Sequence, residues 1–208
     1  MNHDCTLTVI GSESTGNSYA LKYGEQILLI EAGCKVNDVF KAINYKIKDV
    51  VGMIISHAHG WGDHSKYAFE FVKMGIPSLT HPETIKKLDF YGMQGIDHRK
   101  AYRIKNFLIR AIPVPHGDCP CFSYVIDCSD GNRILFITDA SDFPTKVPNV
   151  THLMIEANYS MDIIERNAVK DQWNFSASNT HMSLEKATEV IERHKSASLQ
   201  TVTLLHLS

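Results

Sequence analysis

The sequence predicts an α/β protein in which buried strands alternate with helices and polar side chains gather where strands end. Short continuous apolar runs, such as 50–55 and 133–137, have the uncharged, β-branched character of strands that are covered on both faces. Between such runs lie segments with apolar residues at helical spacing, of which 184–191 is the clearest. Several predicted strands are followed by histidine or aspartate. These observations favour layers of strands and helices with a functional site at the strand ends.

The amino-terminal half divides into short elements at glycine, proline and polar turns. The predicted elements are a strand at 6–10, a tight loop at 11–18, a hairpin at 18–22 and 26–30, a helix at 36–43, a strand at 50–55, a helix at 66–74, a strand from 76 and a helix at 82–88. The loop 11–18 has small hydroxyl residues between glycines. It lacks the Lys-Ser/Thr end of a P-loop, so nucleotide binding of that kind is disfavoured.

The carboxy-terminal half is richer in strands. The predicted elements are strand-like runs in 103–114, strands at 122–126, 133–137 and 152–156, a helix at 184–191 and a strand at 201–205. Ser183 is a good N-cap for the helix. No linker composition interrupts the chain, so we expect the 208 residues, 1–208, to form a single domain.

The strand at 50–55 leads directly into a segment rich in potential metal ligands. His57, His59, Asp63 and His64 lie within eight residues. Imidazole and carboxylate suit zinc, manganese or iron, and the absence of cysteine here argues against a closed structural zinc site. A polar loop whose histidines merely face water explains this density of ligands poorly. The segment therefore predicts a metal site.

Composition narrows the classes of function. The formal net charge of −2 and the pI of about 6.6 exclude a general polycation. One stretch, 86–110, carries seven Lys or Arg against two Asp, and a solvated surface explains it as well as phosphate binding does. The amino terminus has no secretory-signal pattern, nothing in the sequence reads as a membrane span, and five cysteines without Cys-x-x-Cys spacing fit a reducing compartment. We therefore expect a cytoplasmic protein without a membrane partner. The sequence does not define its oligomeric state.

The histidine-rich segment resembles the His-x-His-x-Asp-His signature of the metallo-β-lactamase fold superfamily. It is two residues longer than that signature, because Gly60-Trp61-Gly62 stands where the family has one residue. Either His57 and His59 keep the first two positions and the loop bulges before Asp63, or His59 takes the first position and Trp61 the second. We favour the first register, because Ile-Ile-Ser-His is the family's usual entry and an indole offers no lone pair to a metal. Trp61 is then expected to project over the cleft, where it could stack on a base.

Other segments resemble the same superfamily in the same order. Residues 11–18 are similar to the Gly-Ser-x-Ser-x-Gly-Asn opening of its small nuclease-like members. His116, before a Gly-Asp turn, matches the next ligand, and Asp139 resembles the carboxylate that bridges two metals. His181 and the final His206-Leu-Ser are similar to the closing pattern of phosphodiesterases and nucleases, in which the last His is a metal ligand and the earlier one a proton donor.

The resemblance covers residues 11–208 and implies a four-layered αβ/βα sandwich. It is strongest to the small YycJ-like and tRNA 3′-processing-like nuclease and phosphodiesterase branches. The implied ligands are His57, His59 and His116 on one ion, Asp63, His64 and His206 on the other, and Asp139 between them. Asp63 is also expected to orient the attacking hydroxide and His181 to protonate the leaving oxygen. Glu31 stands where the family commonly has an Asp that braces the metal loop.

The function implied is hydrolysis of phosphodiester bonds, in DNA or RNA, by a hydroxide that bridges two divalent metal ions. Zinc is the first expectation for both ions, with manganese and iron as alternatives. Two other functions stay open. One is a phosphodiesterase for small molecules or cyclic nucleotides; the other is a non-catalytic protein that binds one metal, if the insertion at 60–62 disrupts the site.

Overall fold

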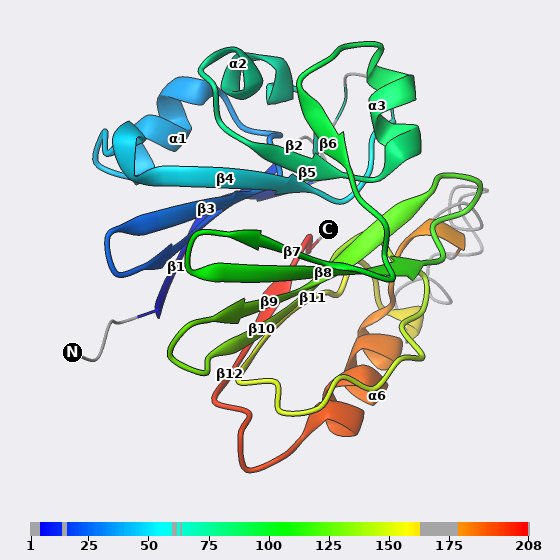
Figure 1. Cartoon of the computed structure of the whole chain (residues 1–208). Helices are drawn as coiled ribbons and strands as arrows, with labels where there is room; N and C mark the ends of the chain where they lie inside the picture. Colours follow the sequence, from blue (N-terminus) through cyan, green and yellow to red (C-terminus); the bar gives the residue numbers. More distant parts are fainter. Residues whose placement is uncertain (1–4, 14–15, 60–61, 63, 163–178, 208) are drawn as a thin grey trace.

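Two six-stranded sheets face each other and carry helices on their outer faces (Figure 1). The computed structural model describes residues 5–13, 16–59, 62, 64–162 and 179–207. Figure 1 shows α1 (Val36–Ala42), α2 (Ala68–Lys73) and α3 (Pro82–Leu88) over the first sheet and α6 (Leu184–His194) over the second. This layering confirms the predicted α/β class and the four-layered sandwich. Among the described residues, no helix is both long and apolar enough to cross a membrane.

The first sheet contains its strands in sequence order. They are β1 (Cys5–Glu13), β2 (Gly16–Tyr23), β3 (Gln26–Ile30), β4 (Val50–Ile55), β5 (Ser78–Thr80) and β6 (Met93–Gly95). The first three strands pair antiparallel, and β3 to β6 pair parallel. A short 3-10 turn, Ile47–Asp49, precedes β4. Because parallel strands end at the same edge of a sheet, the residues that follow β3 and β4 come together there.

The second sheet has the order β12-β11-β10-β9-β8-β7. Its strands are β7 (Ala101–Ile104), β8 (Phe107–Val114), β9 (Cys121–Cys128), β10 (Arg133–Ile137), β11 (His152–Glu156) and β12 (Thr201–Leu205). The strands β7 to β10 pair antiparallel, and β10 to β12 pair parallel. The carboxyl ends of β10, β11 and β12 therefore form a second edge that carries side chains toward one place.

A large apolar core fills the space between the sheets. Tyr19 and Phe136, one from each sheet, meet edge to face with ring centroids 5.7 Å apart. Burial of each such side chain stabilises the fold by roughly 1.5–3 kcal/mol. Smaller apolar clusters lie under the helices on both outer faces. Ser183 caps α6 as the sequence predicts, since its Oγ accepts a 3.1 Å hydrogen bond from the Lys186 amide.

One segment differs from the prediction. The loop expected at 11–18 is mostly strand, because β1 continues to Glu13 and β2 begins at Gly16. A Cβ on Gly16 would lie 2.4 Å from the carbonyl oxygen of Gly33. The glycine therefore permits a close approach between β2 and the segment that follows β3, rather than a tight turn. The strand β6 also lacks a sequence signal, since Met-Gln-Gly has no strand-forming pattern.

Candidate metal centre

Three histidines at the ends of β4 and β8 form one group of possible ligands. His57 and His59 follow β4, His116 follows β8, and their ring nitrogens lie within 4.8 Å of one another. His59 Nε2 and His116 Nε2 are 2.7 Å apart. His116 Nδ1 lies 2.7 Å from the carbonyl oxygen of Thr180, which can only accept, so Nδ1 carries the proton and Nε2 keeps its lone pair.

The ring of His57 provides the test of whether this group fits a metal ion. Its Nδ1 lies 2.9 Å from Ser56 Oγ, whereas its buried Nε2 has no hydrogen-bond partner among the described residues. A buried polar atom left without a partner costs about 1–3 kcal/mol. Burial also lowers the pKa of His57 well below its usual value, so the ring is neutral. A neutral imidazole can bind a divalent cation through a ring nitrogen that has no other partner, as Nε2 has none here among the described residues.

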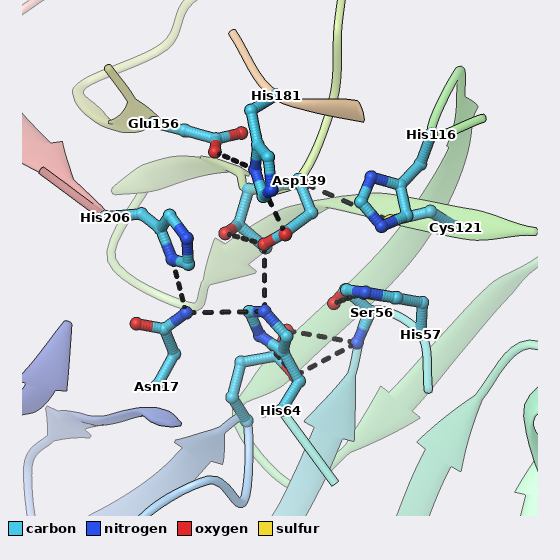
Figure 2. Close-up of polar contacts among 12 residues, drawn as sticks. Asn17, Ser56, His57, His64, His116, Cys121, Asp139, Glu156, His181 and His206 are labelled. Atoms are coloured by element: carbon cyan, nitrogen blue, oxygen red, sulfur yellow. Dashed lines mark hydrogen bonds and ion pairs between the residues drawn. The ribbon is translucent and has the colours of Figure 1, made fainter. Parts of the chain in front are cut away.

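Asp139, which follows β10, occupies the middle of the site (Figure 2). It forms one potential ligand group with His57 and His64, and its Oδ2 lies 2.9 Å from His64 Nε2. Burial would raise the pKa of this carboxyl, but the neighbouring histidines, His64 first, hold it well below the usual range. Asp139 is therefore an anion. A shared anion at this point would offset the repulsion between two cations.

Glu31 contacts His64 on its other ring nitrogen. Glu31 Oε2 lies 3.5 Å from His64 Nδ1, and both carboxylate oxygens accept from the Ser56 amide, at 3.0 and 3.3 Å. Burial alone would lower the pKa of His64, but the carboxylates of Asp139 and Glu31 raise it well above its usual value. Burial in turn raises the pKa of Glu31, and the charge of His64 opposes that rise. Glu31 thus holds the backbone where the histidine-rich segment begins, at the position where the resemblance implies a bracing carboxylate, and its charge lies beside His64.

A second group of possible ligands contains a residue that sequence reasoning misses. Asp139, Glu156, His181 and His206 each bring a ligand atom within 4.8 Å of the others. Glu156 is the last residue of β11, and burial raises its pKa to about 7. His181 Nδ1 lies 2.6 Å from Glu156 Oε1 and 3.4 Å from Asp139 Oδ1. The available signal is a carboxylate at the end of an apolar strand, placed beside Thr138 once β10 and β11 pair in parallel register.

The structure brings together every expected site residue that it describes. His57 and His59 both lie against His116, which is the arrangement of the first register. His64 and His206, expected on one ion, have ring centroids 6.1 Å apart and belong to different groups that share Asp139. Asp63, expected as a ligand and as the residue that orients hydroxide, lies outside the described residues, and so does Trp61.

Three residues turn their side chains into the site through left-handed backbone. Glu31, Asp139 and His206 have φ of 62°, 47° and 51°. They follow β3, β10 and β12 directly or within two residues. A side chain in this region of backbone space costs about 1 kcal/mol or more. These three positions are strand ends that deliver polar groups to the site, whereas the other left-handed non-glycine residues that the structure describes, Asn44, Tyr45, Asp89, Lys105 and Asn149, lie elsewhere.

Comparisons with known proteins agree with the fold. No protein-family model matches the sequence. The exodeoxyribonuclease WalJ of Streptococcus pneumoniae, serotype 2 strain D39, is 22% identical over 218 residues, which are 97% of this chain and 81% of WalJ.

Three solved structures are similar over 97% of the chain. The metallo-β-lactamase fold protein YhfI from Bacillus subtilis has a TM-score of 0.73 at 19% identity, with 85% of its chain covered. A diphosphatase of the PhnP family has a TM-score of 0.69 at 16% identity, with 85% covered. The short form of human tRNase Z has a TM-score of 0.61 at 11% identity, with 92% covered. The chain therefore has the metallo-β-lactamase fold.

Proposed function

We propose that this chain is a metal-dependent phosphodiesterase that acts on nucleic acid. The observation that carries the proposal is a set of three adjoining ligand groups: one has three histidines, and the other two share Asp139, with His57 and His64 on one side and the His181–Glu156 pair and His206 on the other. His57, His59 and His116 would hold one divalent ion. Asp63, His64 and His206 would hold the second, with Asp139 between them. When bound, such ions acidify a water molecule and stabilise the charge that develops on phosphoryl oxygens.

His181 supports this proposal because it is placed as a proton donor. Its Nδ1 faces Glu156 at 2.6 Å, which leaves Nε2 as the ring atom that can reach a substrate. The side chain is 23% exposed, so it borders solvent while its carboxylate partner is buried. Burial would lower the pKa of His181, but the hydrogen bond and charge of Glu156 raise it. At neutral pH the pair therefore retains a proton for a leaving oxygen.

Two observations favour nucleic acid as the substrate class. WalJ is named as an exodeoxyribonuclease and the human neighbour as a tRNase, and both resemble this chain over nearly its full length. The basic stretch contributes less than its sequence suggests, because several of its cations have acidic partners. These pairs are Lys86–Glu83, Arg99–Asp97 and Arg110–Asp127. Within the described parts of the chain, exposed Arg103 and Lys105 have no acidic partner within 4.0 Å and remain available to phosphates.

Zinc is our first candidate for the metal, because imidazole nitrogens predominate among the ligands. Manganese and iron accept the same ligands and must be assayed beside it. The rival substrate class is small diphosphates or phosphodiesters, which the PhnP-family neighbour favours through its description as a diphosphatase. A protein that binds metal without catalysis is the rival outside enzymes.

The test combines metal analysis of the purified protein with hydrolysis assays in zinc and in manganese. The substrates are an aryl phosphodiester and labelled single- and double-stranded DNA and RNA, each with free and blocked ends. We expect the wild-type protein to bind metal and to cleave nucleic acid. Asp139→Ala should lose both metal and cleavage. His152→Ala is the matched control, because His152 lies at the opposite end of β11, on Thr201 and Asn132. Activity that survives Asp139→Ala would reject the assignment, and metal binding without any hydrolysis would favour the binding protein.

A further inference from the structure

Asn17 links two candidate ligands that come from distant parts of the chain. It lies on β2 and is completely buried. Its Nδ2 lies 2.8 Å from His206 Nδ1 and 3.3 Å from His64 Nε2 (Figure 2). Figure 2 also shows the ring of His64 between Asn17 and Asp139. The proposed mechanism gives Asn17 no role, although it contacts both sides of the site.

Behind Asn17 lies a chain of hydroxyl groups that returns to His206. Tyr19 Oη is 3.4 Å from Asn17 Oδ1 and 2.8 Å from Ser12 Oγ. Ser12 Oγ in turn accepts a 2.8 Å hydrogen bond from the backbone amide of His206. The side chain and the backbone of His206 are therefore both fastened to the β1–β2 hairpin. Ser12 and Asn17 belong to the segment 11–18 noted in the sequence, and Tyr19 follows it on β2.

The donors and acceptors in this row of hydrogen bonds decide whether the oxygen or the nitrogen of the Asn17 amide faces His206. A half-turn about the last side-chain bond of Asn17 exchanges Oδ1 and Nδ2 without moving another atom. A histidine that offers Nε2 to a cation carries its proton on Nδ1, and that proton needs an acceptor. The amide nitrogen cannot accept, whereas the amide oxygen can.

With the oxygen toward His206, the hydrogen bonds behind it run in one direction and give the His206 Nδ1 proton an acceptor. His206 Nδ1 donates to Asn17 Oδ1, Asn17 Nδ2 donates to Tyr19 Oη, and Tyr19 Oη donates to Ser12 Oγ. The two lone pairs of Ser12 Oγ then receive Tyr19 and the His206 amide. With the nitrogen toward His206, the amide would instead fix the proton on Nε2 and block that atom.

We infer that Asn17 is a positioning residue: its amide oxygen accepts from His206 Nδ1 and so presents His206 Nε2 to the metal centre. The inference rests on the proposed function only for the identity of the ion. The tautomer of His206 is a property of the chain itself. Partners that orient a ligating histidine in this way are typically worth 10- to 100-fold in metal affinity.

The test compares Asn17→Leu, which keeps the size of the side chain, with Asn17→Asp, which keeps an oxygen toward His206. Zinc affinity is measured by competition with a chelating dye, and the His206 tautomer by 15N NMR of the zinc-free protein at alkaline pH. We expect Asn17→Leu to bind zinc about 10- to 100-fold more weakly and to move the proton from Nδ1 to Nε2. Asn17→Asp should restore the wild-type tautomer and most of the affinity.

Asn132→Leu is the matched control, because it removes another amide–imidazole contact, 3.2 Å to His152, outside the site. Thermal unfolding of all variants separates positioning from a general loss of packing. A proton on Nε2 of His206 in the wild-type protein would overturn the inference, and so would an unchanged tautomer in Asn17→Leu. If the wild type binds no zinc, the proposed function fails, whereas the tautomer still decides the role of Asn17.

Discussion

Replacement of Glu156 by Gln should move the pH dependence of catalysis without emptying the metal site. Gln keeps the shape of the side chain and the contact with His181 but removes the charge. The 2.6 Å separation of Glu156 Oε1 and His181 Nδ1 makes this charge the nearest anion to the ring. An opposite charge at such a distance shifts a pKa by about 1–3 units, and each unit is about 1.36 kcal/mol.

The sign of the effect follows from the raised pKa of His181. A raised pKa keeps the proton donor charged to higher pH, so activity is lost as pH rises through that pKa. Glu156→Gln lowers the pKa of His181. The pH at which kcat declines on the alkaline side should therefore move about 1–3 units lower. At pH values above the pKa of His181 in the wild type, the variant should cleave nucleic acid about 10- to 10³-fold more slowly than the wild type. At pH values below the lowered pKa in the variant, the two enzymes should have the same rate.

The assay is the pH profile of kcat on a nucleic-acid substrate and on an aryl phosphodiester, whose phenolate leaves without a proton. Only the first profile should move. Glu185→Gln is the matched control, because Glu185 is exposed in the first turn of α6 and accepts from Ser160 and the Met161 amide. Equal displacement of both profiles, or a profile that does not move, would refute the role of the Glu156–His181 pair. Metal content is measured on the same samples and should be unchanged.

Three further predictions test the rest of the site. His206→Ala should lower metal content and impair both substrates together, whereas His181→Ala should keep its metal and lose about 10²- to 10⁴-fold on substrates with poor leaving groups, as metal analysis and leaving-group comparison will show. Glu31→Gln should weaken metal binding by about 10- to 100-fold in a chelator competition, because it removes the negative charge beside His64 Nδ1; unchanged affinity would show that Glu31 does not support the site. Arg103→Glu combined with Lys105→Glu should raise KM for long nucleic acid and flatten its salt dependence, with the aryl phosphodiester unaffected; equal effects on both substrates would argue against phosphate contacts there.

The sequence is informative where a strand and its polar end are continuous. The apolar run 50–55 continues directly into His57, and 133–137 continues into Asp139, so one pattern supplies both the burial and the ligand. The fold class follows for the same reason, because parallel buried strands have a distinctive composition. The residues expected at the centre and described by the structure lie within a few ångströms of one another.

The sequence is less informative where a role depends on register between strands. Glu156 is a single carboxylate after an ordinary strand, and only its pairing beside β10 brings it to His181. Asn17 reaches His206 because the two sheets face each other, a relationship that no local pattern encodes. Such contacts are made by topology, so the residues involved carry no signature of their own.

The fastening of His206 to the β1–β2 hairpin sets an order of events during synthesis. Asn17 and His206 are 189 positions apart, and Ser12 and His206 are 194 positions apart. Loops of this length close slowly relative to local hairpins and helices. A nascent chain can therefore pair β1 to β6 long before β12 leaves the ribosome, and its histidines after β4 are present from that time. The candidate ligands His57, His59 and His116 are therefore all made early, whereas the contacts that tie His206 to β1 and β2 form only after residue 206 is added.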